Sequence, residues 1–130
     1  MKIEVSMNME KNKVLVVEDN ELNMKLVKDL LKIGKYQVFE AVDAESGIQL
    51  AREHQPNLIL MDIQLPGMNG LCAIKVIKED DTLKDIPVVA LTSHAMAGDE
   101  DKAIKAGCIG YITKPIDTRM FLKSISPYLN

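Results

Sequence analysis

The strongest constraint in this sequence of 130 residues is an alternation of short apolar runs with longer amphipathic stretches, repeated about five times. The apolar runs predict strands, and the stretches between them carry apolar residues at helical spacing. Alternating strands and helices are typical of βαβ units and of a parallel sheet with right-handed crossovers. We therefore predict an α/β fold, a five-stranded parallel sheet with helices on both faces. The strands are expected at residues 14–17, 37–42, 58–63, 88–91 and 110–113.

Residues typical of helix ends flank the amphipathic stretches. Asn20 and Asp43 can each cap a following helix, and Gly34 and Pro56 can end the first two helices. Pro127 is expected to distort or end the last helix. The first helix should bury a stripe made of Leu22, Leu26, Leu30 and Leu31. The remaining helices are expected around residues 71–77, 99–106 and 121–129.

Composition excludes several classes of protein. With 47% hydrophobic residues the chain is too apolar for general disorder, and no apolar run approaches the roughly 20 residues of a membrane span. A net charge of −3 makes nucleic acid a poor partner, because binding phosphates requires clustered basic side chains. We expect one domain over residues 13–130, preceded by a flexible leader at 1–12 and followed by no output domain.

The cysteines indicate a reducing compartment. Cys72 and Cys108 lie far apart and form no CxxC pair, so we expect two buried or half-buried free thiols. Residues 1–12 also lack the apolar stretch of a signal peptide. Together these features predict a cytoplasmic protein.

Polar side chains follow four of the five predicted strands. In an open parallel sheet, ligands bind beyond the C-terminal ends of the strands. Asp62 interrupts an otherwise apolar run, where a charge is costly unless it is paired or bound to a metal. The polar residues at the four strand ends are Glu18 and Asp19, Asp62, Thr92 and Ser93, and Lys114.

The acidic residues among them allow structural and functional interpretations. Singly, Asp62 could cap a turn near Asn69 or pair with Lys114, and Glu18 and Asp19 could be acids at a helix N-terminus. Together, three carboxylates at one edge repel one another, and Lys114 offsets only one of their charges. A hard divalent cation such as Mg²⁺ would relieve the repulsion, because it takes oxygen ligands. The set therefore favours a Mg²⁺ site that also accepts a phosphoryl group.

Short motifs in a fixed order carry a family resemblance. They are Val17-Glu18-Asp19-Asn20, Met61-Asp62, Gln64-Leu65-Pro66, Gly70, Leu91-Thr92-Ser93 and Tyr111-Ile112-Thr113-Lys114-Pro115. Each motif alone is weak, but the ordered set is specific. The chain resembles the receiver domain of bacterial two-component response regulators over about residues 13–129. This resemblance implies a flavodoxin-like receiver fold with strand order 2-1-3-4-5, acting as a stand-alone regulator in a phosphorelay.

The resemblance also implies roles for the site residues. Asp62 would be the phosphoacceptor, taking its phosphoryl group from a phosphohistidine on a sensor histidine kinase or a histidine phosphotransfer protein. Asp19, Asp62 and the backbone carbonyl of Gln64 would hold Mg²⁺. Glu18 would assist directly or through water, and Lys114 would pair first with the carboxylate and later with a phosphoryl oxygen.

A conformational switch is implied as well. Thr92 would donate its hydroxyl to the phosphoryl group, and Tyr111 would swing inward as Thr92 moves. The change would be read on the face formed by the helix at 99–106, the strand at 110–113 and the last helix, where a downstream protein would bind. Taken alone, Thr92 could be an ordinary strand residue and Tyr111 a half-buried aromatic. The Lys114–Pro115 bond is expected to be cis.

Three residues are expected to tune the lifetime of the phosphorylated state. By the resemblance, Gln64 and His94 flank the approach of the hydrolytic water, and neither is a carboxylate that would orient it strongly. Ser93 is larger than alanine and should narrow that approach. Slow dephosphorylation is therefore predicted.

Other functions fit the sequence less well. A flavodoxin-like enzyme that binds FMN is disfavoured because Glu18 and Asp19 would repel its phosphate. An aspartate-nucleophile phosphatase would carry a second acid where this chain has Gln64. A scaffold without phosphorylation is disfavoured by the complete set Asp62, Thr92 and Lys114.

Overall fold

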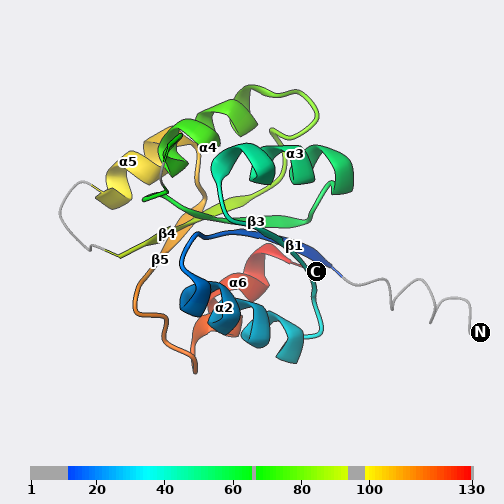
Figure 1. Cartoon of the computed structure of the whole chain (residues 1–130), viewed down its shortest axis with the longest axis vertical. Helices are drawn as coiled ribbons and strands as arrows, with labels where there is room; N and C mark the ends of the chain where they lie inside the picture. Colours follow the sequence, from blue (N-terminus) through cyan, green and yellow to red (C-terminus); the bar gives the residue numbers. More distant parts are fainter. Residues whose placement is uncertain (1–11, 66, 94–98, 130) are drawn as a thin grey trace, which may run out of the picture.

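The computed structural model describes residues 12–65, 67–93 and 99–129. In this part of the chain five strands form one parallel sheet in the order β2-β1-β3-β4-β5 (Figure 1), which confirms the predicted fold. The strands are β1 (Lys13–Val17), β2 (Gln37–Ala41), β3 (Leu58–Asp62), β4 (Val88–Thr92) and β5 (Gly110–Thr113). The helices are α2 (Glu21–Ile33), α3 (Ala44–His54), α4 (Gly70–Glu79), α5 (Asp99–Ala106) and α6 (Phe121–Ile125), with a 3₁₀ helix η1 (Ser126–Tyr128) after α6.

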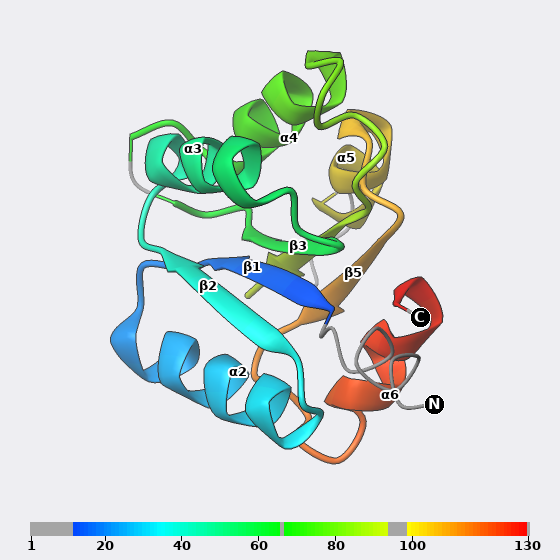
Figure 2. The same ribbon diagram turned by 90° about the vertical axis from the view of Figure 1, so that its right-hand side faces the viewer.

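The helices lie in two layers, one on each face of the sheet. Helices α3, α4 and α5 cover one face, and α2 and α6 cover the other (Figures 1 and 2). Side chains of β1 alternate between the layers: Leu15 and Val17 join the core under α3 and α4, while Val14 and Val16 join the core under α2 and α6. This alternation explains why the apolar runs are continuous, since both faces of each central strand are buried.

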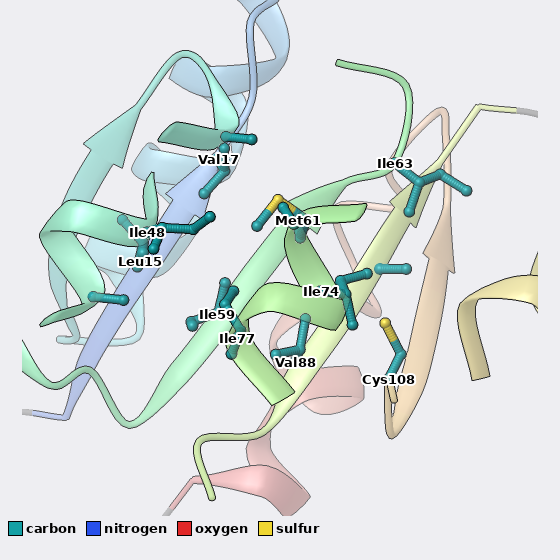
Figure 3. Packing of buried hydrophobic residues seen from close by; sticks show 14 of the residues in the cluster. Leu15, Val17, Ile48, Ile59, Met61, Ile63, Ile74, Ile77, Val88 and Cys108 are labelled. Atoms are coloured by element: carbon teal, nitrogen blue, oxygen red, sulfur yellow. The ribbon is translucent and has the colours of Figure 1, made fainter. Parts of the chain in front are cut away.

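Figure 3 shows the core on the α3–α5 side. Ile59 and Met61 of β3 lie beneath Ile74 and Ile77 of α4, and Ile48 of α3 packs in the same cluster. These contacts fix the position of α4 on the sheet close to the end of β3. Burial of each such side chain stabilises the fold by roughly 1.5–3 kcal/mol.

The helix ends follow the predicted chemistry. The side chain of Asn20 accepts a hydrogen bond from the backbone of Asn23 at 2.9 Å, and that of Asp43 accepts one from Ser46 at 2.8 Å. Gly34 lies directly after α2 as expected. The last helix changes to a 3₁₀ turn after Ile125, with a proline near its start, as predicted for Pro127.

Two predictions about burial were wrong. Leu22 is 79% exposed and Leu26 is only partly buried, whereas Leu30 and Leu31 are buried as predicted and are joined by Met24 and Val27. Leu22 lies about 200° around the helix from Met24, so both cannot face the sheet. Cys72 is exposed on α4, whereas Cys108 is buried as expected.

The leader predicted at residues 1–12 lies almost entirely outside the described part of the chain. Its last residue, Asn12, accepts a backbone hydrogen bond from Gln37 at 2.9 Å and so adjoins the sheet. No helix among the described residues combines the length and apolar character needed to cross a membrane.

Candidate active site

The parallel strands bring the predicted site residues to one edge of the sheet. Val17 pairs with Met61, so the residues that follow them, Glu18 and Asp62, are neighbours across the β1–β3 ladder. Carboxylate oxygens of Glu18, Asp19 and Asp62 lie within 4.8 Å of one another. The sequence prediction that these three acids converge is confirmed geometrically.

The acids differ in burial although two of them are adjacent in the chain. Glu18 is 1% exposed and Asp62 is 3% exposed, whereas Asp19 is exposed. Two of the carboxyl groups therefore lie inside the protein and one faces solvent. A buried carboxylate needs a cation or several donors to offset lost hydration.

Lys114 supplies one such cation. Its Nζ lies 2.5 Å from Oε1 of Glu18 and 3.2 Å from Oδ2 of Asp62. Burial alone would lower the pKa of Lys114, but the ion pairs with both carboxylates outweigh burial and raise the pKa, so the ammonium stays charged. Burial raises the pKa of Glu18, opposed in part by the Lys114 ammonium and by the backbone of Asn20.

Backbone donors orient the carboxylates. The amide of Gln64 donates to Oδ1 of Asp62 at 2.8 Å, and the amide of Asn20 donates to Oε2 of Glu18 at 3.1 Å. Each buried acid therefore has one oxygen near Lys114 and the other on a backbone N–H. These contacts fix the orientation of both carboxylate groups before any ligand binds.

Helix α4 begins in close contact with the chain that carries Asp62. A Cβ added to Gly70 would meet the backbone oxygen of Asp62 and would lie 2.5 Å from Cα of Ile63. Only glycine fits at this point without movement of the backbone. Asn69 caps the helix by accepting a hydrogen bond from Cys72 at 2.9 Å.

The donor set matches the chemistry of Mg²⁺. The three carboxylates offer oxygen ligands only, and one ammonium leaves the cluster with excess negative charge. Glu18, Asp19 and Asp62 are thus the residues that could hold a hard divalent ion.

Comparison with known proteins gives the family. The chain matches the response regulator receiver domain family over residues 14–126. It is 49% identical to the polar-differentiation response regulator DivK of Brucella anthropi over 116 residues, which make up 89% of this chain and 94% of that protein. The chain belongs to the response regulator receiver domain family. This receiver domain is a signalling switch of a two-component system.

Solved receiver domains have the same fold. The receiver domain of sensor histidine kinase PA1611 from Pseudomonas aeruginosa PAO1, solved with a magnesium ion coordinated in its active site cleft, has a TM-score of 0.84 and 27% identity, covering 91% of this chain and 97% of that one. A Saccharomyces cerevisiae complex of the histidine phosphotransfer protein Ypd1 with the receiver domain of Ssk1 gives a TM-score of 0.81 and 30% identity, covering 91% of this chain and 88% of that one.

The switch residues predicted for this receiver domain occupy two different places. Thr92 ends β4, is buried and is joined to the next strand, because its carbonyl accepts the backbone hydrogen of Lys114 at 2.7 Å. Tyr111 lies on β5, which is an edge strand, and is 46% exposed. The Lys114–Pro115 bond is cis, as expected.

One contact at the site was not anticipated. The hydroxyl of Ser93 donates to the side-chain oxygen of Gln64, which links the loops that follow β4 and β3. The sequence pattern predicted a role for both residues but not their contact, because they are 29 positions apart in the chain. His94, the third residue predicted to tune lifetime, lies outside the described residues.

Proposed function

We propose that this receiver domain accepts a phosphoryl group on Asp62. The observation that carries the proposal is the combination at Asp62 of burial, the Lys114 ammonium at 3.2 Å, and two further carboxylates within 4.8 Å. No other cluster of three such acidic side chains was found in the described part of the chain. Asp62 is also the acidic residue that ends a fully buried strand.

In the proposed reaction, a carboxylate oxygen of Asp62 attacks the phosphorus of a phosphohistidine. The new O–P bond forms as the N–P bond breaks, and the leaving imidazole takes up a proton from solvent. The amide of Gln64 and the ammonium of Lys114 hold the carboxylate plane during the attack. After transfer, Lys114 can follow the charge to a phosphoryl oxygen, because it already lies between Glu18 and Asp62.

Mg²⁺ would be held by Asp19 and Asp62, with the backbone carbonyl of Gln64, and by Glu18 directly or through water. When bound, the ion would neutralise phosphoryl oxygens and align the in-line transfer. Magnesium in the cleft of the PA1611 receiver domain supports this assignment.

The phosphoryl donor is proposed to be a sensor histidine kinase or a histidine phosphotransfer protein. The Ypd1 complex of a similar receiver domain supports the second source. We place this protein in the cytoplasm, a reducing compartment in which the free thiols of Cys72 and Cys108 would persist.

The downstream target is proposed to bind the face formed by α5, β5 and α6. Three large apolar side chains, Ile104, Tyr111 and Met120, are nearly half exposed there. A pocket of about 230 Å³ between β5 and α6 is lined by Tyr111 and Met120. Phosphorylation would draw Thr92 toward the new oxygens and let Tyr111 turn inward, reshaping this surface.

Slow loss of the phosphoryl group is also proposed. Ser93 contacts the side chain of Gln64, whose backbone amide bonds the carboxylate of Asp62, and neither side chain is a strong base. Decay of the purified phosphorylated protein should quicken in Ser93→Ala, which removes the hydroxyl that holds Gln64. Equal decay of the two proteins would contradict the role of this contact.

The experiment that tests the central proposal is intact-mass analysis after incubation with acetyl phosphate and Mg²⁺. The wild-type protein should gain one phosphoryl group, and Asp62→Asn should gain none while keeping its circular dichroism spectrum. Asp85→Asn, a change at an exposed acid elsewhere, is the matched control and should behave as wild type. Modification of Asp62→Asn, or equal modification with EDTA in place of Mg²⁺, would overturn the assignment.

A further inference from the structure

A groove lies between α4 and α5, and none of the three clustered carboxylates lines it. It has a volume of about 270 Å³ and is lined by Leu71, Lys75, Lys102, Lys105 and Ala106. Both helices belong to the layer opposite α2 and α6 (Figure 2). The proposed phosphoacceptor is not among its lining residues, so nothing in the mechanism above accounts for it.

The three lysines around this groove have no acidic partner in the described part of the chain. Lys25, Lys28, Lys84 and Lys114 each form an ion pair, whereas no ion pair among the described residues involves Lys75, Lys102 or Lys105.

Among the acidic residues of the same two helices whose side chains the structure describes, Glu79, Glu100 and Asp101, none lines the groove. A local cluster of three positive charges therefore stands on a chain whose net charge is −3.

The floor of the groove is aliphatic. Leu71 is half-buried against the core, and Ala106 is buried. The hydrocarbon stems of the lysines extend this apolar surface, since such side chains bury their stems and keep their charge in water. A complementary ligand would thus carry a small aliphatic group with negative charges around it.

We propose that the α4–α5 groove binds an acidic amphipathic helix of a partner protein. An aliphatic residue of that helix would rest on Leu71 and Ala106, with carboxylates three or four positions away reaching the lysines. A nucleotide is a poorer occupant, because the lining has neither an aromatic side chain for a base to stack on nor an arginine for bidentate phosphate binding. The groove would give this receiver a second docking surface, independent of the proposed phosphorylation.

The test uses a fluorescein-labelled helical peptide of about 15 residues, long enough to be partly helical in water, with leucines on one face flanked by glutamates. Binding is followed by fluorescence anisotropy and mapped by amide chemical shifts of the full-length protein at low salt. We expect the largest shifts in α4 and α5, and an affinity at least about tenfold weaker in Lys75→Glu/Lys102→Glu, because two attractions become repulsions. A peptide with the glutamates replaced by lysines should not bind.

The matched control is Lys32→Glu/Lys123→Glu, which changes net charge equally on the opposite layer of the molecule. Its affinity for the peptide should be within about twofold of that of the wild type, since charges far from the groove are screened by salt. Equal weakening in both double variants, or shifts centred away from α4 and α5, would overturn the proposal. The outcome does not depend on Asp62, so Asp62→Asn should bind the peptide as wild type does.

Discussion

Replacing Gly70 by alanine should destabilise this receiver domain, although alanine is the better helix former. Glycine at a helix position ordinarily costs about 0.5–1 kcal/mol relative to alanine, so propensity alone predicts a gain. The new methyl group would lie 2.5 Å from Cα of Ile63, where carbon atoms normally stay about 3.5–4.0 Å apart. Because the obstacle is backbone, no side-chain rotation can relieve the contact.

The magnitude follows from these opposing terms. Overpacking costs typically about 1–3 kcal/mol, and a contact against backbone belongs at the upper end of that range. Because the higher helix propensity of alanine offsets part of this cost, we expect a net loss of about 1–2 kcal/mol in the free energy of unfolding. The contact also involves the backbone of Asp62, so relief of the clash should displace the carboxylate and slow phosphorylation.

The assay is urea unfolding followed by circular dichroism, together with the rate of phosphorylation by acetyl phosphate in Mg²⁺. Gly67→Ala is the matched control, because Gly67 lies in the loop before α4 with φ of 73° and has nothing within 4 Å of an added Cβ. It should lose about 1–2 kcal/mol through its left-handed backbone, with little change in phosphorylation rate. A Gly70→Ala protein as stable as wild type, phosphorylated at the wild-type rate, would refute the steric argument.

Three further predictions rest on separate features. Cys72 should react with a thiol reagent at pH 8 in the folded protein, whereas Cys108 should react only in denaturant, because burial raises the pKa of its thiol to about 11. Hydrogen bonds from Ser46 lower the pKa of Asp43 from its ordinary value of 3.8. The stabilisation that these bonds provide is therefore complete above pH 3.8 and is lost as the pH falls below that value and through the lowered pKa. As the pH is lowered, Asp43→Asn should therefore lose less of its free energy of unfolding than the wild type loses. An equal loss in the two proteins would contradict this. Lys114→Met should lower the free energy of unfolding by up to about 3 kcal/mol, because two buried acids lose their cation, and Mg²⁺ should restore part of the loss in thermal unfolding.

The sequence alone determined the architecture because the relevant signals are local. A strand buried on both faces must be apolar throughout, and the run ending at Asp62 shows that pattern within five residues. The caps at Asn20 and Asp43 depend on a residue and the amide three positions later, so a short window of sequence contains both partners. The convergence of acids followed from the same logic, since parallel strands end at one edge.

Other features were decided only by the tertiary structure, because their partners are distant in the chain. Glu18 and Asp19 are adjacent and chemically alike, yet only Glu18 turns toward Lys114, which lies 96 positions later, while Asp19 stays in solvent. Leu22 looked like a core residue, but the sheet surface beneath α2 selected the face of Met24 and left Leu22 exposed. In each case a periodic or compositional signal allowed two orientations of nearly equal local energy, and packing against a surface built from remote residues chose between them.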